Sequence, residues 1–104
     1  PSSDSHFIAP LKIIADTAKV WAALKQALLS QPRTVITQET ADTLDAEATS
    51  LIFRFVDDIK IILDSENNLI QIRSASRVGY GDFGVNRNRV EQLRAQLQQD
   101  KLIE

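Results

Sequence analysis

The sequence has no cysteine and no methionine, and only one histidine, one tryptophan and one tyrosine among its 104 residues. The absence of cysteine excludes disulfides and thiolate metal sites, and it leaves the redox compartment undetermined. The single histidine, His6, lies in the polar N-terminal stretch, so we expect no catalytic triad, metal site or cofactor built on it. Because methionine is missing, we expect that residues preceded Pro1, from a signal or membrane anchor or from a longer cytosolic chain.

Long apolar runs are also missing, and none approaches the roughly 20 residues of a membrane-spanning helix. The formal net charge of -2 gives the whole molecule no general attraction to nucleic acid or to an anionic membrane. A composition of 43% hydrophobic and 25% charged residues is typical of one globular domain with a single core. We therefore assign residues 1–10 to a polar tail or linker and residues 11–104 to a single α+β domain.

Two segments have the periodicity of amphipathic helices. The first is predicted over Thr17–Ser30, with Asp16 as its N-cap and Pro32 just beyond its end. The second follows Asn86, its expected N-cap, with a hydrophobic staple from Val85. The apolar stripes of the two helices consist of Val20, Leu24, Ala27, Leu28, Val90, Leu93 and Leu97.

Residues 34–77 carry the alternating apolar and polar positions of strands. We predict four strands, around residues 35–37, 44–55, 59–63 and 70–72, with turns near residues 41–42 and 65–68. The alternation shifts phase at Ser50, which predicts a bulge or break there.

These elements predict an α+β fold in the order α-β-β-β-β-α. The sheet is expected to be a four-stranded antiparallel meander with both helices packed on one face. The predicted core consists of Trp21, Leu24, Leu28, Phe53, Phe55, Ile61, Ile72, Val90, Leu93 and Leu97.

The stretch "RSASRVGYGDFGVNRNR" at residues 73–89 contains all three glycines of the chain and its only tyrosine. Glycines between a strand and a helix predict positive φ, or a close approach to the backbone, at Gly79, Gly81 or Gly84. Such a loop before a helix N-terminus is also a natural place for an anion. Four arginines could donate hydrogen bonds from their guanidinium groups to such an anion: Arg73, Arg77, Arg87 and Arg89. The spacing G-x-G-x-x-G does not indicate a dinucleotide site, because no alternating strand-helix-strand unit follows.

Charge is distributed unevenly along the chain. Residues 1–70 hold six basic and ten acidic residues, whereas residues 71–94 hold five basic residues against two acidic ones. Arginines in the first turn of a helix oppose its dipole at a cost of about 0.3–1 kcal/mol each. We therefore expect a functional site or a set of compensating carboxylates, for which Asp57, Asp58 and Asp82 are available.

Three interpretations of this Arg/Gly-rich corner stay open. In the first, the corner binds a small anion or an acidic segment of a partner. In the second, it is the site of a hydrolase-like or other enzyme that acts on an anionic substrate with aspartate as base. In the third, the cluster of arginines and aspartates is purely structural. Adjacent strand residues such as Asp57 and Asp58 point to opposite faces, which disfavours a shared catalytic site. Hydroxyls such as those of Ser74 and Ser76 are expected to bond to backbone. The candidate ligand contacts are Arg73, Ser74, Ser76, Arg77, Tyr80, Asp82, Asn86, Arg87 and Arg89, with Asp57 and Asp58 as supporting carboxylates, and no catalytic residue is identified.

Several stretches carry a family resemblance: "FIAPL", "VWAALKQAL", "QPRTVI", "LIFRFVDDIKIILD" and "IQIRSASRVGYGDFGVNRNRVEQLR". They resemble the uncharacterised bacterial and plastid family known as domain of unknown function 1499, over nearly the whole chain. The resemblance implies a domain that often follows a signal, lipoprotein or membrane-anchoring segment, and hence a cell-envelope location, although a cytoplasmic one stays open. The asparagine-cysteine-valine element of many members is missing here. The family has no established activity, so the resemblance does not decide between a binding module and an enzyme. We favour a binding module because no histidine, cysteine or lysine is well placed near the corner.

Overall fold

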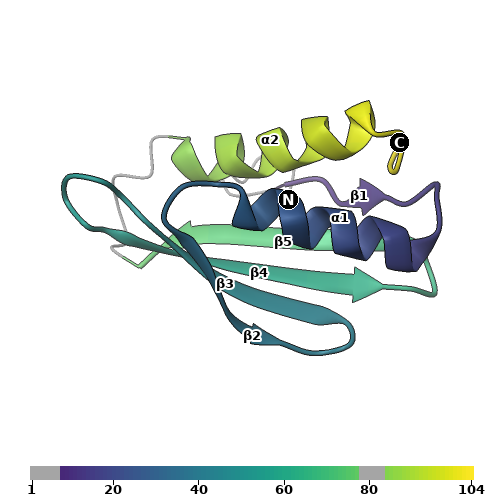
Figure 1. Cartoon of the computed structure of the whole chain (residues 1–104), viewed down its shortest axis with the longest axis horizontal. Coiled ribbons are helices and arrows are strands. Elements are labelled where there is room, and N and C mark those ends of the chain that lie inside the picture. Colours follow the sequence, from purple (N-terminus) through teal and green to yellow (C-terminus); the bar gives the residue numbers. More distant parts are fainter. Residues whose placement is uncertain (1–7, 78–83) are drawn as a thin grey trace.

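A computed structural model describes residues 8–77 and 84–104, so the predictions for Gly79, Tyr80, Gly81 and Asp82 lie outside the described residues. The described chain folds in the order β-α-β-β-β-β-α, with a layer of two helices on a sheet (Figure 1). The elements are β1 (Leu11–Lys12), α1 (Thr17–Leu29), β2 (Thr34–Glu39), β3 (Thr43–Thr49), β4 (Val56–Asp64), β5 (Leu69–Ser76) and α2 (Val85–Gln99).

The sheet is antiparallel and has the strand order β1-β5-β4-β3-β2. The α+β class with two helices is confirmed, but the prediction of four strands is wrong because β1 adds a fifth. This strand pairs Leu11 with Ile70 and Lys12 with Leu69 at the sheet edge. Two residues are too few to show an alternating pattern, so the strand leaves no periodic signal in the sequence.

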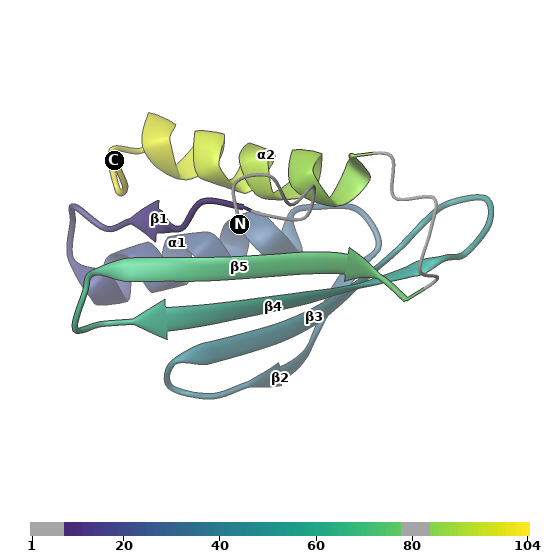
Figure 2. The same ribbon diagram turned by 180° about the vertical axis from the view of Figure 1, so that it is seen from behind.

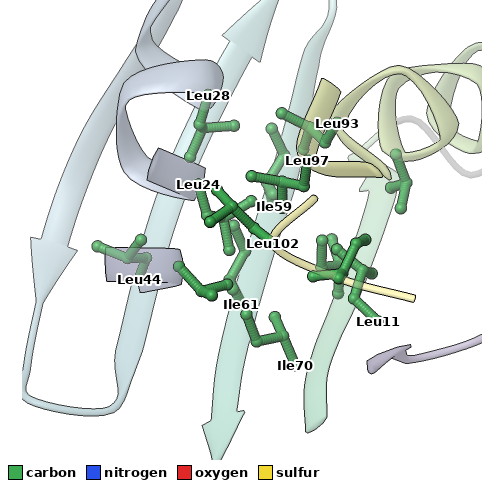
Figure 3. Close-up of a cluster of buried hydrophobic side chains, with 14 of the residues drawn as sticks. Leu11, Leu24, Leu28, Leu44, Ile59, Ile61, Ile70, Leu93, Leu97 and Leu102 are labelled. Carbon is green, nitrogen blue, oxygen red and sulfur yellow. The ribbon is translucent and has the colours of Figure 1, made fainter. Parts of the chain in front are cut away.

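Both helices cover the same face of the sheet, and α1 lies behind the strands when the molecule is turned around (Figure 2). Helix α1 begins after Asp16, whose carboxylate accepts a hydrogen bond from the Lys19 amide at 3.1 Å, as the N-cap prediction requires. Leucine and isoleucine side chains from both helices and from the inner sheet face form one core (Figure 3). Its largest fully buried members are Leu11, Leu24, Leu28, Leu44, Ile59, Ile61, Ile70, Leu93 and Leu97.

The core assignment is wrong for two of the predicted residues. Phe53 and Phe55 lie at the connection between β3 and β4 and are 73% and 48% exposed. The expected break at Ser50 is a complete reversal of the chain, because β3 ends at Thr49 and β4 begins at Val56. The apolar alternation therefore continues past the end of the strand, out of reach of the helices. Trp21 is partly buried against the core, and the other predicted core residues are buried in it.

The start of α2 also differs from the prediction. Gly84, with φ of 84°, is the N-cap, and Asn86 is already the second helical residue, 2% exposed. Positive φ is therefore confirmed at Gly84. Since the helix begins earlier, Val85 is its first residue and is half-exposed, so the staple expected from an Asn86 cap is wrong.

Candidate functional site at the arginine end

A buried polar network joins α2 to the inner face of the sheet. Asp57 and Ser74 are on β4 and β5, in the same inward register as Ile59 and Ile72. Arg89 donates through Nη2 to Asp57 Oδ2 at 3.0 Å and through Nη1 to Ser74 Oγ at 3.0 Å. The side chains of Arg89 and Asp57 are only 14% and 15% exposed. This guanidinium therefore ties the helix to two central strands.

Asn86 completes this network from the first turn of α2. Its Oδ1 accepts hydrogen bonds from Arg89 Nη1 at 2.7 Å and from the Ser74 hydroxyl. The expectation that Ser74 bonds to backbone is therefore wrong, because its hydroxyl bonds to two side chains. Within the described residues, no buried side-chain polar atom lacks a hydrogen-bond partner. The network satisfies the polar groups that the fold buries.

On the outer face, Arg77 binds two carboxylates. Its Nε and Nη2 donate to the two oxygens of Asp58, each at 2.9 Å, and Nη2 also donates to Glu47 at 2.6 Å. These hydrogen bonds, to Asp58 first and to Glu47 second, raise the pKa of Arg77 above its ordinary value. Glu47 and Asp58 are directly opposite each other on β3 and β4, so Arg77 relieves their repulsion.

The sheet thus divides the predicted corner between its two faces. Asp57 and Asp58 serve different arginines on opposite faces, as expected for adjacent strand residues. Arg73 is exposed on the outer face, directly opposite Lys60, and lines a shallow hollow of about 450 Å³ with Lys60 and Ile62. Ser76 is partly buried on the inner face, and Arg87 is exposed on the first turn of α2.

A pocket of about 300 Å³ opens beside the first turns of α2. It lies between that helix, the connection from α1 to β2 and the base of the β3–β4 hairpin. Its polar lining includes Arg33, Asp57, Asn88, Arg89 and Gln92. We call the surrounding region, residues 31–34, 47–58, 73–77 and 84–92, the arginine end. In this pocket, cationic, amide and carboxylate groups of the described residues line one concavity.

The sequence interpretation missed three polar residues of the pocket, Arg33, Asn88 and Gln92, of which Arg33 carries a charge. Its Nε donates to the Thr49 carbonyl at 2.8 Å, and the Thr49 amide donates to the Arg33 carbonyl at 3.0 Å. Arg33 has no carboxylate partner within residues 8–77 and 84–104. Its φ of 53° is uncommon for a non-glycine residue. The only sequence signal is its position directly after Pro32, where a helix has ended and a strand begins.

The described ranges contain neither a group of metal-ligating side chains nor a helix able to cross a membrane. No group of three or more histidine, cysteine, aspartate or glutamate side chains among residues 8–77 and 84–104 is arranged to hold a metal ion. Neither α1 nor α2 has the length and apolar character to cross a membrane.

The fold and the arginine end define a small α+β domain in which one helix is joined to an antiparallel sheet by a buried arginine network. The chain belongs to the family described as "Protein of unknown function (DUF1499)", whose model matches residues 2–97. No curated protein and no solved structure matches the chain. The family membership therefore carries no activity.

Proposed function

We propose that this domain is a binding module of the cell envelope, which holds a small anion or an acidic segment of a partner in the pocket at the arginine end. The observation that carries the proposal is the state of Arg33. Its Nε is fixed by the Thr49 carbonyl, while no carboxylate of the described residues neutralises its charge. A guanidinium held at a concavity without a counter-ion is well suited to a carboxylate or phosphate from outside.

The ion pair of Arg89 with Asp57 supports the same proposal. Both groups line the pocket, and an ionised aspartate alone would repel an anion there. Because Arg89 neutralises Asp57, the remaining charge of the pocket lining is that of Arg33. The amides of Asn88 and Gln92 add neutral hydrogen-bond donors. The buried network is thus structural in itself, and it also leaves the pocket with a net positive lining.

Catalysis has less support. A general base needs a carboxylate that is free to accept a proton from a substrate. Asp57 and Asp58 each accept hydrogen bonds from an arginine, and they lie on opposite faces of the sheet. The Ser74 hydroxyl is held between Arg89 and Asn86. We therefore place binding ahead of an enzyme that uses these aspartates.

The test measures the melting temperature with added phosphate, sulfate or succinate at constant ionic strength. At ten times the dissociation constant of a bound anion, linkage predicts a rise of about 5–10 °C for a domain of this size. Arg33→Gln should remove this rise, because glutamine can still bond to the Thr49 carbonyl but carries no charge. Arg73→Gln is the matched control, since Arg73 is exposed on the outer face and does not line the pocket.

Two results would contradict the proposed function. One is a wild-type melting temperature that does not respond to any of the anions. The other is an equal response of wild type, Arg33→Gln and Arg73→Gln, which would indicate a general salt effect.

A further inference from the structure

The connection between β3 and β4 carries a cluster of exposed apolar side chains. We call residues 50–55 the hairpin tip. Leu51, Ile52, Phe53 and Phe55 are between 48% and 79% exposed. The rings of Phe53 and Phe55 stack with their centroids 5.6 Å apart, so they form one apolar surface. Apolar residues scattered singly over a surface need no explanation, but a contiguous cluster of four marks a binding site.

The hairpin tip projects from the body of the molecule and is held in shape by its own hydrogen bonds. In Figure 1 it is the teal loop at the left, which extends past the first turn of α2. The Ser50 amide donates to the Phe55 carbonyl and the Phe55 amide donates to Ser50 Oγ, both at 2.9 Å. Arg54 adopts a φ of 58° within this turn. A closed turn presents its apolar side chains without a large ordering cost on binding.

Positive charge surrounds the hairpin tip. Arg54 is part of it and Arg33 is bonded to its base, and neither forms an ion pair with any residue of the described ranges. The described segments of the arginine end hold six basic and four acidic residues, a net charge of +2, although the whole chain carries -2. The basic members are Arg33, Arg54, Arg73, Arg77, Arg87 and Arg89, and the acidic members are Glu47, Asp57, Asp58 and Glu91. The tip is therefore an apolar point on a locally cationic surface, even though the overall charge gives no attraction to anionic surfaces.

The size and shape of the hairpin tip decide what covers it. A stable protein interface takes about 20–30 residues on each side, and four side chains on a convex turn supply far fewer. A bilayer surface adapts to a convex element, accepts phenylalanine and aliphatic side chains below its head groups, and lets arginine reach the phosphates. From this combination we infer that the hairpin tip docks the domain on the surface of an anionic bilayer. Leu51, Ile52, Phe53 and Phe55 enter the interfacial layer, and Arg54 and Arg33 contact the head groups.

This inference stands apart from the anion pocket, because it depends on exposed apolar side chains and not on a concavity. The docking is peripheral, since only one turn of the chain enters the lipid. Binding of this kind is reversible and comparable to that of a single acyl chain. It also sets the orientation of the molecule, with the arginine end toward the lipid.

The experiment is co-sedimentation of the whole chain with phosphatidylcholine vesicles, with and without about a quarter phosphatidylglycerol, at roughly 0.1 M salt. We expect binding to the anionic vesicles and much weaker binding to the neutral ones. The double variant Ile52→Ser/Phe53→Ser should lower the partition coefficient about tenfold or more. Arg54→Gln should lower it about fivefold, with a smaller salt dependence than wild type. Both changes affect exposed residues, and circular dichroism should show an unchanged fold.

Ile14→Ser is the matched control for the apolar change. Ile14 is 57% exposed and lies just before the start of α1. Residues 31–34 of the arginine end lie at the opposite end of this 13-residue helix. Its replacement should leave vesicle binding unchanged. A Phe53→Trp variant should show fluorescence quenching by brominated lipid beyond that of Trp21 alone, and Ile14→Trp should not.

Three outcomes would overturn the inference. The first is no binding to anionic vesicles. The second is binding that Ile52→Ser/Phe53→Ser does not weaken, which would mean adsorption by charge alone. The third is a concentration-dependent dimer, measured without lipid by analytical ultracentrifugation, that the same double variant abolishes, because a second copy would then cover the tip. Failure of the anion pocket is distinguishable, since that test uses soluble anions and Arg33→Gln.

Discussion

Arg89 and Arg77 both bind aspartates of β4, but their surroundings differ. The Arg89–Asp57 pair is mostly buried on the inner face beside Ser74 and Asn86, whereas the side chain of Arg77 is half-exposed on the outer face. Ion pairs in water contribute little, because solvent screens the charges and each long side chain loses freedom. A pair removed from solvent is costly to break, because the remaining charge stays buried without a partner. The inner arginine should therefore matter more for stability.

We predict that Arg89→Ala lowers the free energy of unfolding by about 2–4 kcal/mol. This loss is somewhat below the range for fully buried ion pairs, because both side chains keep some exposure. The variant leaves Asp57, Ser74 and Asn86 without their shared donor. Arg77→Ala should cause a clearly smaller loss. Urea denaturation measures both, and a double-mutant cycle with Asp57→Ala isolates the pair. Equal losses for the two arginines would show that burial does not set their contribution.

At the scale of elements, the sequence predicts α1 closely because a cap, an apolar stripe and a following proline agree over Thr17–Ser30. The paired strands β2–β5 also follow from alternation and turn residues. The hairpin tip is misassigned because Leu51, Phe53 and Phe55 keep the period of a strand, and periodicity alone does not reveal where the covering helices end.

For the candidate site, Asp57 and Asp58 are predicted as partners of arginines, which the ion pairs show. Arg33 could not be predicted, because its approach to Thr49 is a tertiary contact across 16 positions.

The N-cap of α2 adopts the left-handed conformation. Gly84 has φ of 84°, and a Cβ added there would meet no atom within 4 Å, so the cost of a side chain is conformational and not steric. Gly84→Ala should lower the free energy of unfolding by about 1–2 kcal/mol. Gly84→Asn should cost less, since asparagine adopts the left-handed region more readily. Thermal and urea unfolding compare the two variants. A fully stable alanine variant would mean that the cap does not need this conformation.

At the scale of the whole molecule, the two ends of the described chain close the core together. Ile13 and Ile103 form an antiparallel bridge, and the Ile14 amide donates to the Leu102 carbonyl at 3.1 Å. Leu102 and Ile103 are only 5% and 3% exposed. They follow the polar end of α2, where the sequence pattern indicates no core position. The short strand β1 is thus held between β5 on one side and the C-terminal residues on the other. At the arginine end, the hairpin tip extends away from the core.

We predict that Leu102→Ala and Ile103→Ala each lower the free energy of unfolding by about 2–5 kcal/mol, because each removes buried methyl groups from a closed core. Glu104→Gln is the control, since its ion pair with Lys12 is exposed and spans 3.6 Å.

Hydrogen exchange supplies a local measurement, because the Ile14 amide bonds to the backbone of Leu102. Its protection should fall in both alanine variants, while amides in the centre of β4 change only with global stability. Variants as stable as wild type, with an unchanged Ile14 amide, would show that the C-terminal residues do not close the core. Since this end lies away from the arginine end, the same substitutions should leave anion and vesicle binding of the folded protein intact.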